Sequence, residues 1–376
     1  EYYKYSGFTA PEESCHDIFK VGHTSTSVSL ALGVAKARDL KSEKGNVIAL
    51  IGDGSLSGGE AYEGFNNASC LNGNLIIVVN DNDMSIAENQ GGLYQNLKLL
   101  RETNGKAELN FFKSLGFDYV YADDGNNIQK MIDVFKKVKD INHPVVVHVK
   151  TQKGHGLKCA EINKEMFHWI LPKTLDDNNE QIQNNGNADE NYNSITTDFI
   201  LNKAKDDKTV IAITPATPGA YGFTHEFRNK LGENKQYIDV GIAEEHAVAY
   251  ASALAKSGAK PFLAVLSSFI QRTYDQLSQD LCLNKSPITL LVYWGAITGA
   301  DATHLGVFDI PLISNIPNLV YLAPTNKEEY QAMLEYAYKQ TSHPLVIRVP
   351  FGGLVSSGKV DNTDYSILNK FQVTNA

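Results

Sequence analysis

The chain is poor in cysteine, and it lacks both long apolar runs and long basic runs. Its four cysteines are scattered without a C-x-x-C spacing, which indicates reduced thiols in a cytoplasmic protein rather than a disulfide framework. No apolar stretch approaches the ~20 residues of a membrane span, and no signal peptide opens the sequence. The net charge of −9, without clustered Lys and Arg, argues against nucleic acid or an anionic membrane as a partner.

The sequence does contain a repeated alternation of short β-branched runs with helical patterns. Strands that are buried on both faces have continuous apolar sequences, and their alternation with helices is typical of parallel α/β sheets. We therefore predict two α/β domains with parallel sheets flanked by helices. Strands are expected at 46–51, 75–79, 144–149, 209–213, 261–266, 288–293, 319–322 and 344–349, and the longest helices at 27–44, 58–71, 128–141, 244–256, 272–283 and 327–338.

Composition predicts where the domains end. Residues 175–194 are dense in Asn, Asp, Gln and Glu, and such a stretch does not bury a core. We predict a first domain at 1–174, a linker at 175–194 and a second domain at 195–355. The polar segment 356–376 is expected to begin a linker toward a further domain, and the start at Glu1 suggests part of a longer protein.

Two short polar motifs follow neighbouring predicted strands. Gly52-Asp53-Gly54 ends the first strand, and Asn80-Asp81-Asn82 ends the second after 25 intervening residues. Ligands of doubly wound sheets bind beyond the carboxyl ends of strands, so Asp53 and Asn82 are expected in one crevice. A carboxylate, an amide oxygen and a backbone carbonyl, with diphosphate oxygens and a water, form an octahedral site for Mg2+. Either motif alone is more often a simple turn, but the pair at this spacing is the fingerprint of a thiamine diphosphate site.

A third candidate is Glu244, at a predicted strand-to-helix junction. Taken alone, it is better explained as a carboxylate stabilised by the helix dipole. Beside a thiamine diphosphate motif it becomes a candidate activating acid. A carboxyl group hydrogen-bonded to N1′ of the aminopyrimidine favours the imino tautomer that removes the thiazolium C2 proton, and burial favours the protonated carboxyl that this needs.

Through nearly its whole length the chain resembles the deoxyxylulose-phosphate synthase family of the transketolase superfamily. The matching segments are Val21-Gly22-His23-Thr24-Ser25-Thr26-Ser27, Gly52-Asp53-Gly54, Asn80-Asp81-Asn82-Asp83-Met84-Ser85-Ile86, Thr151-Gln152-Lys153-Gly154, Phe167-His168, the segment around Glu244, Phe269-Ile270-Gln271-Arg272-Thr273-Tyr274-Asp275-Gln276, and Gly299-Ala300-Asp301.

The resemblance implies a thiamine diphosphate cofactor, Mg2+, a homodimer and a place in isoprenoid biosynthesis. The implied metal ligands are Asp53, Asn82 and the carbonyl of Met84, and the implied catalytic residues are Glu244, His23 and His168. The implied cofactor contacts are Gly52, Asp53, Gly54, Ser55, Asn82, Ile86, Lys153, Glu244 and Phe269, and the implied substrate contacts are Arg272, Asp301 and His304. For each of these histidines a purely structural explanation is as good as a catalytic role. His23 would then be a loop histidine satisfied by backbone groups, and His168 a packed side chain.

The half of the site that would bind the acceptor departs from the family pattern. The family has Tyr at Leu266, Arg at both Trp294 and Phe351, and one more residue between Asp301 and His304; it also has an N-terminal segment and a third domain that have no counterpart in this sequence. Arginine binds phosphate through bidentate, charge-assisted hydrogen bonds. Two missing arginines therefore predict an altered acceptor.

Three functions stay open at this point. The first is the synthase reaction of the family, which decarboxylates pyruvate and joins the two-carbon unit to glyceraldehyde 3-phosphate. The second keeps the cofactor chemistry with a different, unphosphorylated or more apolar, acceptor. The third is a non-catalytic subunit of such an enzyme, and the presence of Asp53, Asn82 and Glu244 argues against it.

Overall fold

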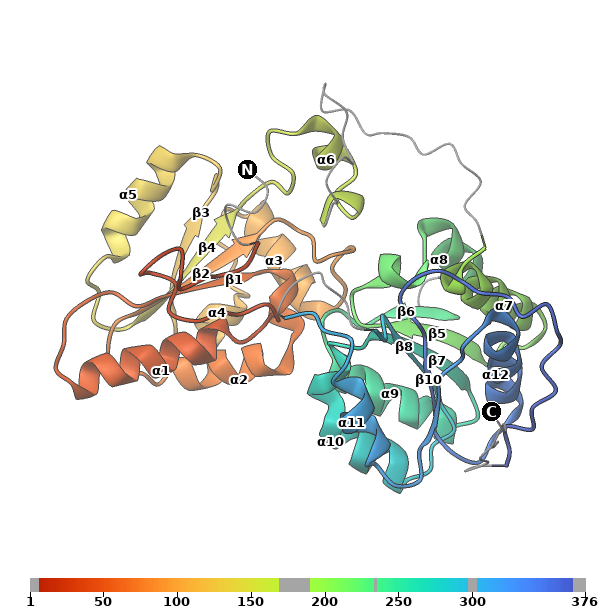
Figure 1. Ribbon diagram of the computed structural model, residues 1–376. Coiled ribbons are helices and arrows are strands. Elements are labelled where there is room, and N and C mark those ends of the chain that lie inside the picture. The colour runs from red at the N-terminus through yellow and green to blue at the C-terminus, as the bar shows by residue number, and fades with distance from the viewer. Residues whose placement is uncertain (1–6, 169–189, 233–234, 297–302, 368–376) are drawn as a thin grey trace. The chain divides into compact units, whose positions relative to one another are not determined.

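The computed structural model describes residues 7–168, 190–232, 235–296 and 303–367. It divides into two compact units (Figure 1). The first unit contains Glu1–Gly186 and Gly241–Ala243, and the second contains Asn187–Val240 and Glu244–Ala376.

The first unit is built on a four-stranded parallel sheet with the order β1-β2-β4-β3. Apolar residues alternate between the two faces of β2, with Ile77 and Val79 in one core cluster and Ile76 and Val78 in another. Figure 1 shows α1 and α2 on one side of the sheet and α5 on the other. The elements are α1 (Ser27–Leu40), β1 (Ile48–Gly52), η1 (Gly54–Ser57), α2 (Gly59–Ala68), β2 (Leu75–Asp81), α3 (Gly92–Glu102), α4 (Phe111–Ser114), β3 (Asp118–Ala122), α5 (Ile128–Val138), β4 (Pro144–Lys150), α6 (Lys158–Ile162) and η2 (Met166–His168).

The second unit contains a six-stranded parallel sheet with the order β6-β5-β7-β8-β10-β9. One core cluster joins the sheet to α7, α8 and α12, and a second joins it to α9, η5 and α11. The elements are α7 (Tyr192–Asp206), β5 (Val210–Thr214), η3 (Pro218–Tyr221), α8 (His225–Leu231), β6 (Tyr237–Asp239), α9 (Glu244–Lys256), β7 (Lys260–Leu266), η4 (Ile270–Thr273), α10 (Tyr274–Gln276), η5 (Leu277–Leu283), β8 (Thr289–Tyr293), α11 (Asp309–Ser314), β9 (Val320–Leu322), α12 (Lys327–Lys339) and β10 (Leu345–Arg348).

The predicted fold class is confirmed, since both sheets are parallel and flanked by helices. All eight predicted strands are present to within about two residues at either end. Two strands were missed. β3 is an edge strand whose polar and aromatic residues do not form an apolar run, and β6 is only three residues long.

A predicted helix and a predicted linker boundary differ from the structure. The helix predicted over 272–283 is divided into the 3-10 turn η4, the short α10 and the π-helix η5. The predicted linker runs to residue 194, but α7 begins at Tyr192 because Asn191 and Ser194 form a reciprocal capping box at its start. Among the described helices, none has the length and apolarity needed to cross a bilayer.

Candidate cofactor site

The two polar motifs of the first unit meet where β1 and β2 end. The strands are parallel neighbours, and Gly52 pairs with Asn80 in register. Directly beyond this pair, the amide of Asp53 donates to the carbonyl of Asn80 at 3.0 Å. The chain after β2 then folds back, so that the amide of Met84 donates to Oδ2 of Asp53 at 3.0 Å. The structure therefore brings Asp53 and the segment 82–84 to one edge of the sheet.

Asp53 is a buried carboxylate with no cationic hydrogen-bond partner among those the structure records. Its side chain is almost fully enclosed, and Oδ2 accepts hydrogen bonds from the Met84 amide and from Nδ2 of Asn89 at 2.8 Å. Burial, followed by the negative charge of nearby Asp81, raises the pKa of Asp53, and these hydrogen bonds offset only part of the increase. A divalent cation at this carboxylate would offset the cost of ionising it.

Asn82 presents an oxygen that the described protein does not use. Its Oδ1 atom is buried and has no hydrogen-bond partner among the described residues, and the same holds for Oδ1 of Asn89. A buried carbonyl-type oxygen without a donor costs about 1–3 kcal/mol. Oxygen atoms are the ligands that Mg2+ prefers, so an orphaned amide oxygen in the loop that contacts Asp53 fits a magnesium site.

Gly54 is required by a close approach of two backbone segments. A Cβ atom at this position would lie 2.8 Å from Cα and 2.7 Å from Oγ of Ser85. The following turn is fixed by a hydrogen bond from Oγ of Ser25 to the carbonyl of Ser55 at 2.8 Å. The tight packing keeps η1 and the start of α2 next to Asp53, where the first amides of a helix attract anions such as phosphate.

Lys153 and His168 contact each other and the same loop. Nζ of Lys153 donates to the carbonyl of Ser85 at 2.5 Å and lies 3.1 Å from Nδ1 of His168. Burial lowers the pKa of Lys153 to about 8, although the charge of Asp53 acts in the opposite direction. Burial and the nearby lysine lower the pKa of His168 to about 4. At neutral pH, therefore, the imidazole is neutral and its Nδ1 accepts from the ammonium.

Two more predicted residues of the first unit have plainer surroundings. His23 lies in the segment before α1 and is half-buried. Ile86, also half-buried, lies in the turn closed by the bridge between Met84 and Glu88. The structure thus places Ile86 in the loop that contacts Asp53.

In the second unit Glu244 is the first residue of α9, and its side chain is nearly fully buried. Burial raises the pKa of Glu244 to about 7, although Arg272 acts in the opposite direction with Nη1 at 3.8 Å from Oε2. Oε2 has no hydrogen-bond partner among the described residues. A carboxyl group that shares its proton near neutral pH and has a free oxygen is suited to hydrogen-bonding a ring nitrogen.

Phe269 and His304 lie together in the second unit. Their rings are 5.5 Å apart between centroids at an interplanar angle of 75°. Phe269 precedes η4, which also carries Arg272, so three of the predicted residues share one neighbourhood. Asp301, the remaining predicted substrate residue, lies outside the described part of the chain.

The two positions at which the family resemblance led us to expect arginine form an aromatic pair. The rings of Trp294 and Phe351 are in edge-to-face contact, with centroids 5.3 Å apart. The neighbouring cation, Arg348, is engaged elsewhere. It donates to Asp309, to the carbonyl of Gly295 at 2.7 Å and to that of Gly306 at 2.6 Å. Arg348 therefore binds the backbone at Gly295 and Gly306, and it does not replace the missing arginines.

Sequence reasoning missed several residues that shape the first unit's site. Asn89 donates to Asp53, and Asp81 is enclosed by His148 and Arg101. The sequence did contain one indication: His148 is the single polar residue in the apolar run of β4. A polar residue inside a buried strand needs a hydrogen-bond partner. For His148 this partner is Asp81, which lies in the Asn80-Asp81-Asn82 motif at the end of the adjacent strand β2.

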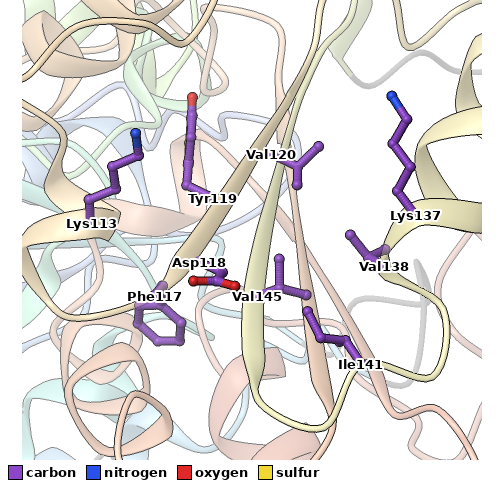
Figure 2. Close-up of a pocket in the computed structure, with 9 residues that line it drawn as sticks. All are labelled: Lys113, Phe117, Asp118, Tyr119, Val120, Lys137, Val138, Ile141 and Val145. Atoms are coloured by element: carbon purple, nitrogen blue, oxygen red, sulfur yellow. The ribbon is translucent and has the colours of Figure 1, made fainter.

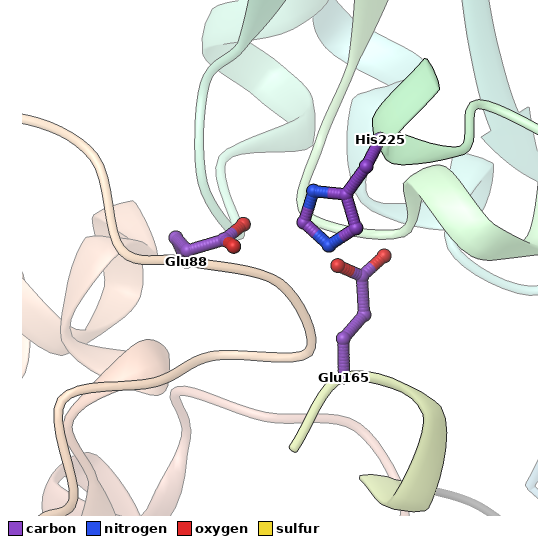
Figure 3. A group of neighbouring side chains, drawn as sticks. All are labelled: Glu88, Glu165 and His225. Atoms are coloured by element: carbon purple, nitrogen blue, oxygen red, sulfur yellow. The ribbon is translucent and has the colours of Figure 1, made fainter. Parts of the chain in front are cut away.

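Two further features fall outside this site. A surface hollow of about 480 Å3 (Figure 2) is lined by residues of β3, β4 and the end of α5, and it contains none of the predicted site residues. Figure 3 draws Glu88, Glu165 and His225, whose side chains are of types that bind metals. Because His225 belongs to the second unit and the positions of the units relative to one another are not determined, no metal site is assigned to this set.

The chain matches known families over both units. Residues 2–110 and 101–151 match the family described as 1-deoxy-D-xylulose-5-phosphate synthase, and residues 191–353 match the transketolase pyrimidine binding domain. The 1-deoxy-D-xylulose-5-phosphate synthase of Clostridium botulinum (strain Eklund 17B / Type B) is 38% identical over 92% of this chain and 61% of its own length. The 1-deoxy-D-xylulose-5-phosphate synthase 1 of Geobacter metallireducens is 38% identical over 92% of this chain and 60% of its own length.

A solved transketolase from Leishmania mexicana is 14% identical over 91% of this chain and 62% of its own, with a TM-score of 0.42. This chain spans about three-fifths of the length of the curated relatives it matches. The predicted family is confirmed by the sequence matches. With both units matched, the chain belongs to the 1-deoxy-D-xylulose-5-phosphate synthase family.

Proposed function

We propose that this chain is a thiamine diphosphate- and Mg2+-dependent transferase that decarboxylates pyruvate and joins the two-carbon unit to an aldehyde such as glyceraldehyde 3-phosphate. The observation that carries the proposal is the pair formed by buried Asp53 and the unpartnered Oδ1 of Asn82 at the ends of neighbouring parallel strands. Family membership and the buried Glu244 of the second unit add support.

The metal ligands in this proposal are all oxygens of the first unit. The carboxylate of Asp53, Oδ1 of Asn82 and the carbonyl of Met84 would hold Mg2+. The hydrogen bond from the Met84 amide to Asp53 fixes the distance between two of the three. Gly52, Gly54 and Ser55 form the turn that would lie beside the diphosphate, and Lys153 would supply a positive charge for it.

Thiamine diphosphate, when bound, supplies a nucleophilic carbon that adds to the substrate carbonyl and a cationic thiazolium ring that takes up the electron pair left by decarboxylation. Glu244 would hold a proton at its carboxyl group and share it with the aminopyrimidine ring, as its raised pKa of about 7 permits. Phe269 would stack on that ring, and Ile86 would contact the cofactor. The neutral imidazole of His168 is available to accept or pass on a proton, and His23 is a second candidate for this task.

One observation favours an alternative acceptor substrate. Arg272, His304 and Asp301 remain as substrate contacts, but the aromatic contact between Trp294 and Phe351 stands where the family pattern has two arginines. A more apolar or unphosphorylated aldehyde or ketose fits this pair better than a phosphorylated triose does. The small-molecule substrates, the homodimer and the cytoplasmic location remain predictions.

The test of the cofactor assignment is binding combined with hydrogen exchange at C2 of thiamine diphosphate. Wild-type protein is expected to bind the cofactor only with Mg2+ and to accelerate exchange in deuterium oxide. Glu244→Ala is expected to bind with modestly reduced affinity and to lose the acceleration. The matched control is Glu245→Ala, the half-buried next residue of the same helix. Exchange at the wild-type rate in Glu244→Ala would show that another group activates the cofactor.

A further inference from the structure

A buried array of polar side chains lies behind the candidate metal loop of the first unit, the segment 82–84. His148 on β4 and Asp81 at the end of β2 are both fully buried, with Nε2 of His148 2.8 Å from Oδ2 of Asp81. The other ring nitrogen, Nδ1, lies 2.7 Å from the hydroxyl of Tyr119 on β3. Three parallel strands thus contribute one polar group each to a single hydrogen-bonded chain.

Arg101 of α3 closes this array from the other side. Its Nη1 is 2.7 Å from both carboxylate oxygens of Asp81, and its Nη2 is 2.5 Å from Oδ1 of Asp83. Because a carboxylate only accepts, Nε2 of His148 must donate to Asp81, and in the neutral imidazole Nδ1 then accepts from the Tyr119 hydroxyl. Every partner of Asp81 is therefore fixed by a second contact.

Asp81 connects this hydrogen-bonded array to the candidate metal loop. Its Oδ1 accepts the amide of Asp83 at 3.0 Å, and Asp83 has a left-handed backbone with φ of 61°. A non-glycine residue in this region is strained, and the surrounding contacts must hold it there. The residue between the two, Asn82, carries the buried oxygen without a partner, and the next residue, Met84, donates to Asp53.

An exclusively structural explanation fits the array poorly. The neighbouring positions of β2 and β4 are apolar and pack well, as Val79 and Val146 do. Burying an ionised aspartate with an arginine and a histidine costs desolvation that apolar residues avoid, and such an array is weak grounds for stability. What it does provide is a single orientation for the backbone that follows Asp81.

We propose that Tyr119, His148 and Arg101 are positioning residues which, through Asp81, hold the segment 82–84 in the shape that presents the Asn82 oxygen and the Met84 carbonyl to a divalent cation. This inference rests on the proposed function. It concerns the geometry of the loop and involves no proton transfer.

The chain offers a closely matched pair of variants. Tyr119→Phe removes one hydroxyl and leaves the ring in place. Tyr121→Phe is the control, because Tyr121 lies on the same strand and contacts His148 edge-on with centroids 5.3 Å apart. The hydroxyl of Tyr121, however, has no hydrogen-bond partner among the described residues. His148→Phe is the stronger variant, since it removes both bonds and keeps a ring of similar size.

The measurement is the affinity of the full chain for Mg2+ in the presence of thiamine diphosphate, by calorimetry, together with the electron paramagnetic resonance spectrum of bound Mn2+. We expect Tyr119→Phe and His148→Phe to weaken Mg2+ binding by roughly 3- to 10-fold and to change the Mn2+ spectrum, because direct partners of metal ligands contribute roughly 10- to 100-fold and these two residues act one step further away, through Asp81. Tyr121→Phe should match wild type in both readouts.

The outcomes distinguish a failure of the positioning role from a failure of the proposed function. Wild-type Mg2+ affinity and an unchanged Mn2+ spectrum in both Tyr119→Phe and His148→Phe would overturn the positioning role, even if these variants unfold at lower temperature. An equal loss in Tyr121→Phe would also overturn it. If wild-type protein binds no Mg2+ with the cofactor, the proposed function itself fails first, and the inference fails with it.

Discussion

Three buried carboxyl groups differ in what surrounds them, and this difference sets their pKa values. Asp81 is as deeply buried as the others, and burial acts to raise its pKa, but hydrogen bonds from His148 and Arg101 outweigh that effect and lower it. Asp53 and Glu244 have no comparable partner, and the pKa of each is raised. A buried acid without a hydrogen-bonded cation is costly to ionise, and this property fits a site for a metal or for a proton-sharing ring.

The first prediction concerns Glu244 and the pH dependence of stability. Because the pKa of Glu244 is raised from 4.5 to about 7 on folding, its ionisation destabilises the folded chain. The destabilisation is absent below pH ~4.5, grows as the unfolded chain ionises, and levels off above pH ~7. In cofactor-free protein, Glu244→Gln should therefore match wild type at pH 4 and be more stable at pH 8 by roughly 3 kcal/mol.

Urea unfolding at both pH values measures this difference. The attraction of Arg272 is already included in the pKa of about 7, so it needs no separate correction. Glu245→Gln is the control and should show no comparable gain at pH 8. A Glu244→Gln chain that is less stable than wild type at pH 8 would mean that the carboxylate has a cationic partner stronger than Arg272.

The second prediction concerns Asp53. Asp53→Ala removes the one carboxylate of the proposed metal site, and we expect Mg2+-dependent thiamine diphosphate binding to be lost while the chain stays folded. Calorimetry measures the binding, and circular dichroism measures the fold. Asp123→Ala, on the exposed side of the same unit, is the control and should bind as wild type does. Wild-type cofactor affinity in Asp53→Ala would remove the metal assignment.

At the scale of elements, the site depends on two turns that pack against each other. The turn after β1 passes so close to the loop after β2 that Gly54 has no space for a side chain toward Ser85. Parallel neighbouring strands bring both turns to one edge, and the glycine allows them to touch. The order β1-β2-β4 therefore positions both Asp53 and its hydrogen-bond donors.

The third prediction compares two glycines of the first unit. In Gly54→Ala the new Cβ would meet backbone Cα of Ser85 at 2.8 Å, so one turn must shift, at a cost of about 1–3 kcal/mol in the free energy of unfolding. Gly33→Ala is the matched control. Gly33 is exposed inside α1 with open space at the Cβ position, and alanine should stabilise that helix by about 1 kcal/mol.

Urea unfolding and cofactor titration together check this pair. Gly54→Ala should also weaken Mg2+-dependent thiamine diphosphate binding, because the displaced turn carries Asp53. Gly33→Ala should leave that binding unchanged. Equal effects of the two substitutions on binding would show that the close approach to Ser85 does not shape the site.

At the scale of the whole molecule, the two units differ in how closely their sites follow the family pattern. The first unit retains the polar residues at the ends of β1 and β2, whereas the second carries the pair of Trp294 and Phe351. Phosphate leaving water needs charged donors, and the indole N–H is one neutral donor. Arg348 is occupied by Asp309 and two backbone carbonyls.

The fourth prediction follows from that pair. We expect glyceraldehyde 3-phosphate to be a poor acceptor compared with unphosphorylated glyceraldehyde, measured as the ratio of kcat/KM values. Two lost charge-assisted hydrogen bonds at ~1.5–3 kcal/mol each amount to roughly two to four orders of magnitude. Restoring arginine at Trp294 and Phe351 together should shift the ratio toward the phosphorylated triose. A strong wild-type preference for the phosphorylated form would return the chain to the usual synthase specificity.

Sequence alone determined the class of fold and the family, because both depend on local patterns. Apolar β-branched runs predict buried parallel strands, and Gly52-Asp53-Gly54 with Asn80-Asp81-Asn82 needs only spacing to be recognised. The apolar pattern did not predict the edge strand β3, because an edge strand does not need to be apolar on both faces.

Only the tertiary structure decided how those residues are used. The contacts of His148 with Asp81 and of Trp294 with Phe351 each join segments more than 50 residues apart, and the Asn82 oxygen is buried without a partner among the described residues only because the chain folds around it. The same is true of the raised pKa of Glu244, which depends on burial by the packed core of the second unit. Local pattern specifies which groups are available, whereas burial and the partners brought by folding determine their charge, orientation and chemistry.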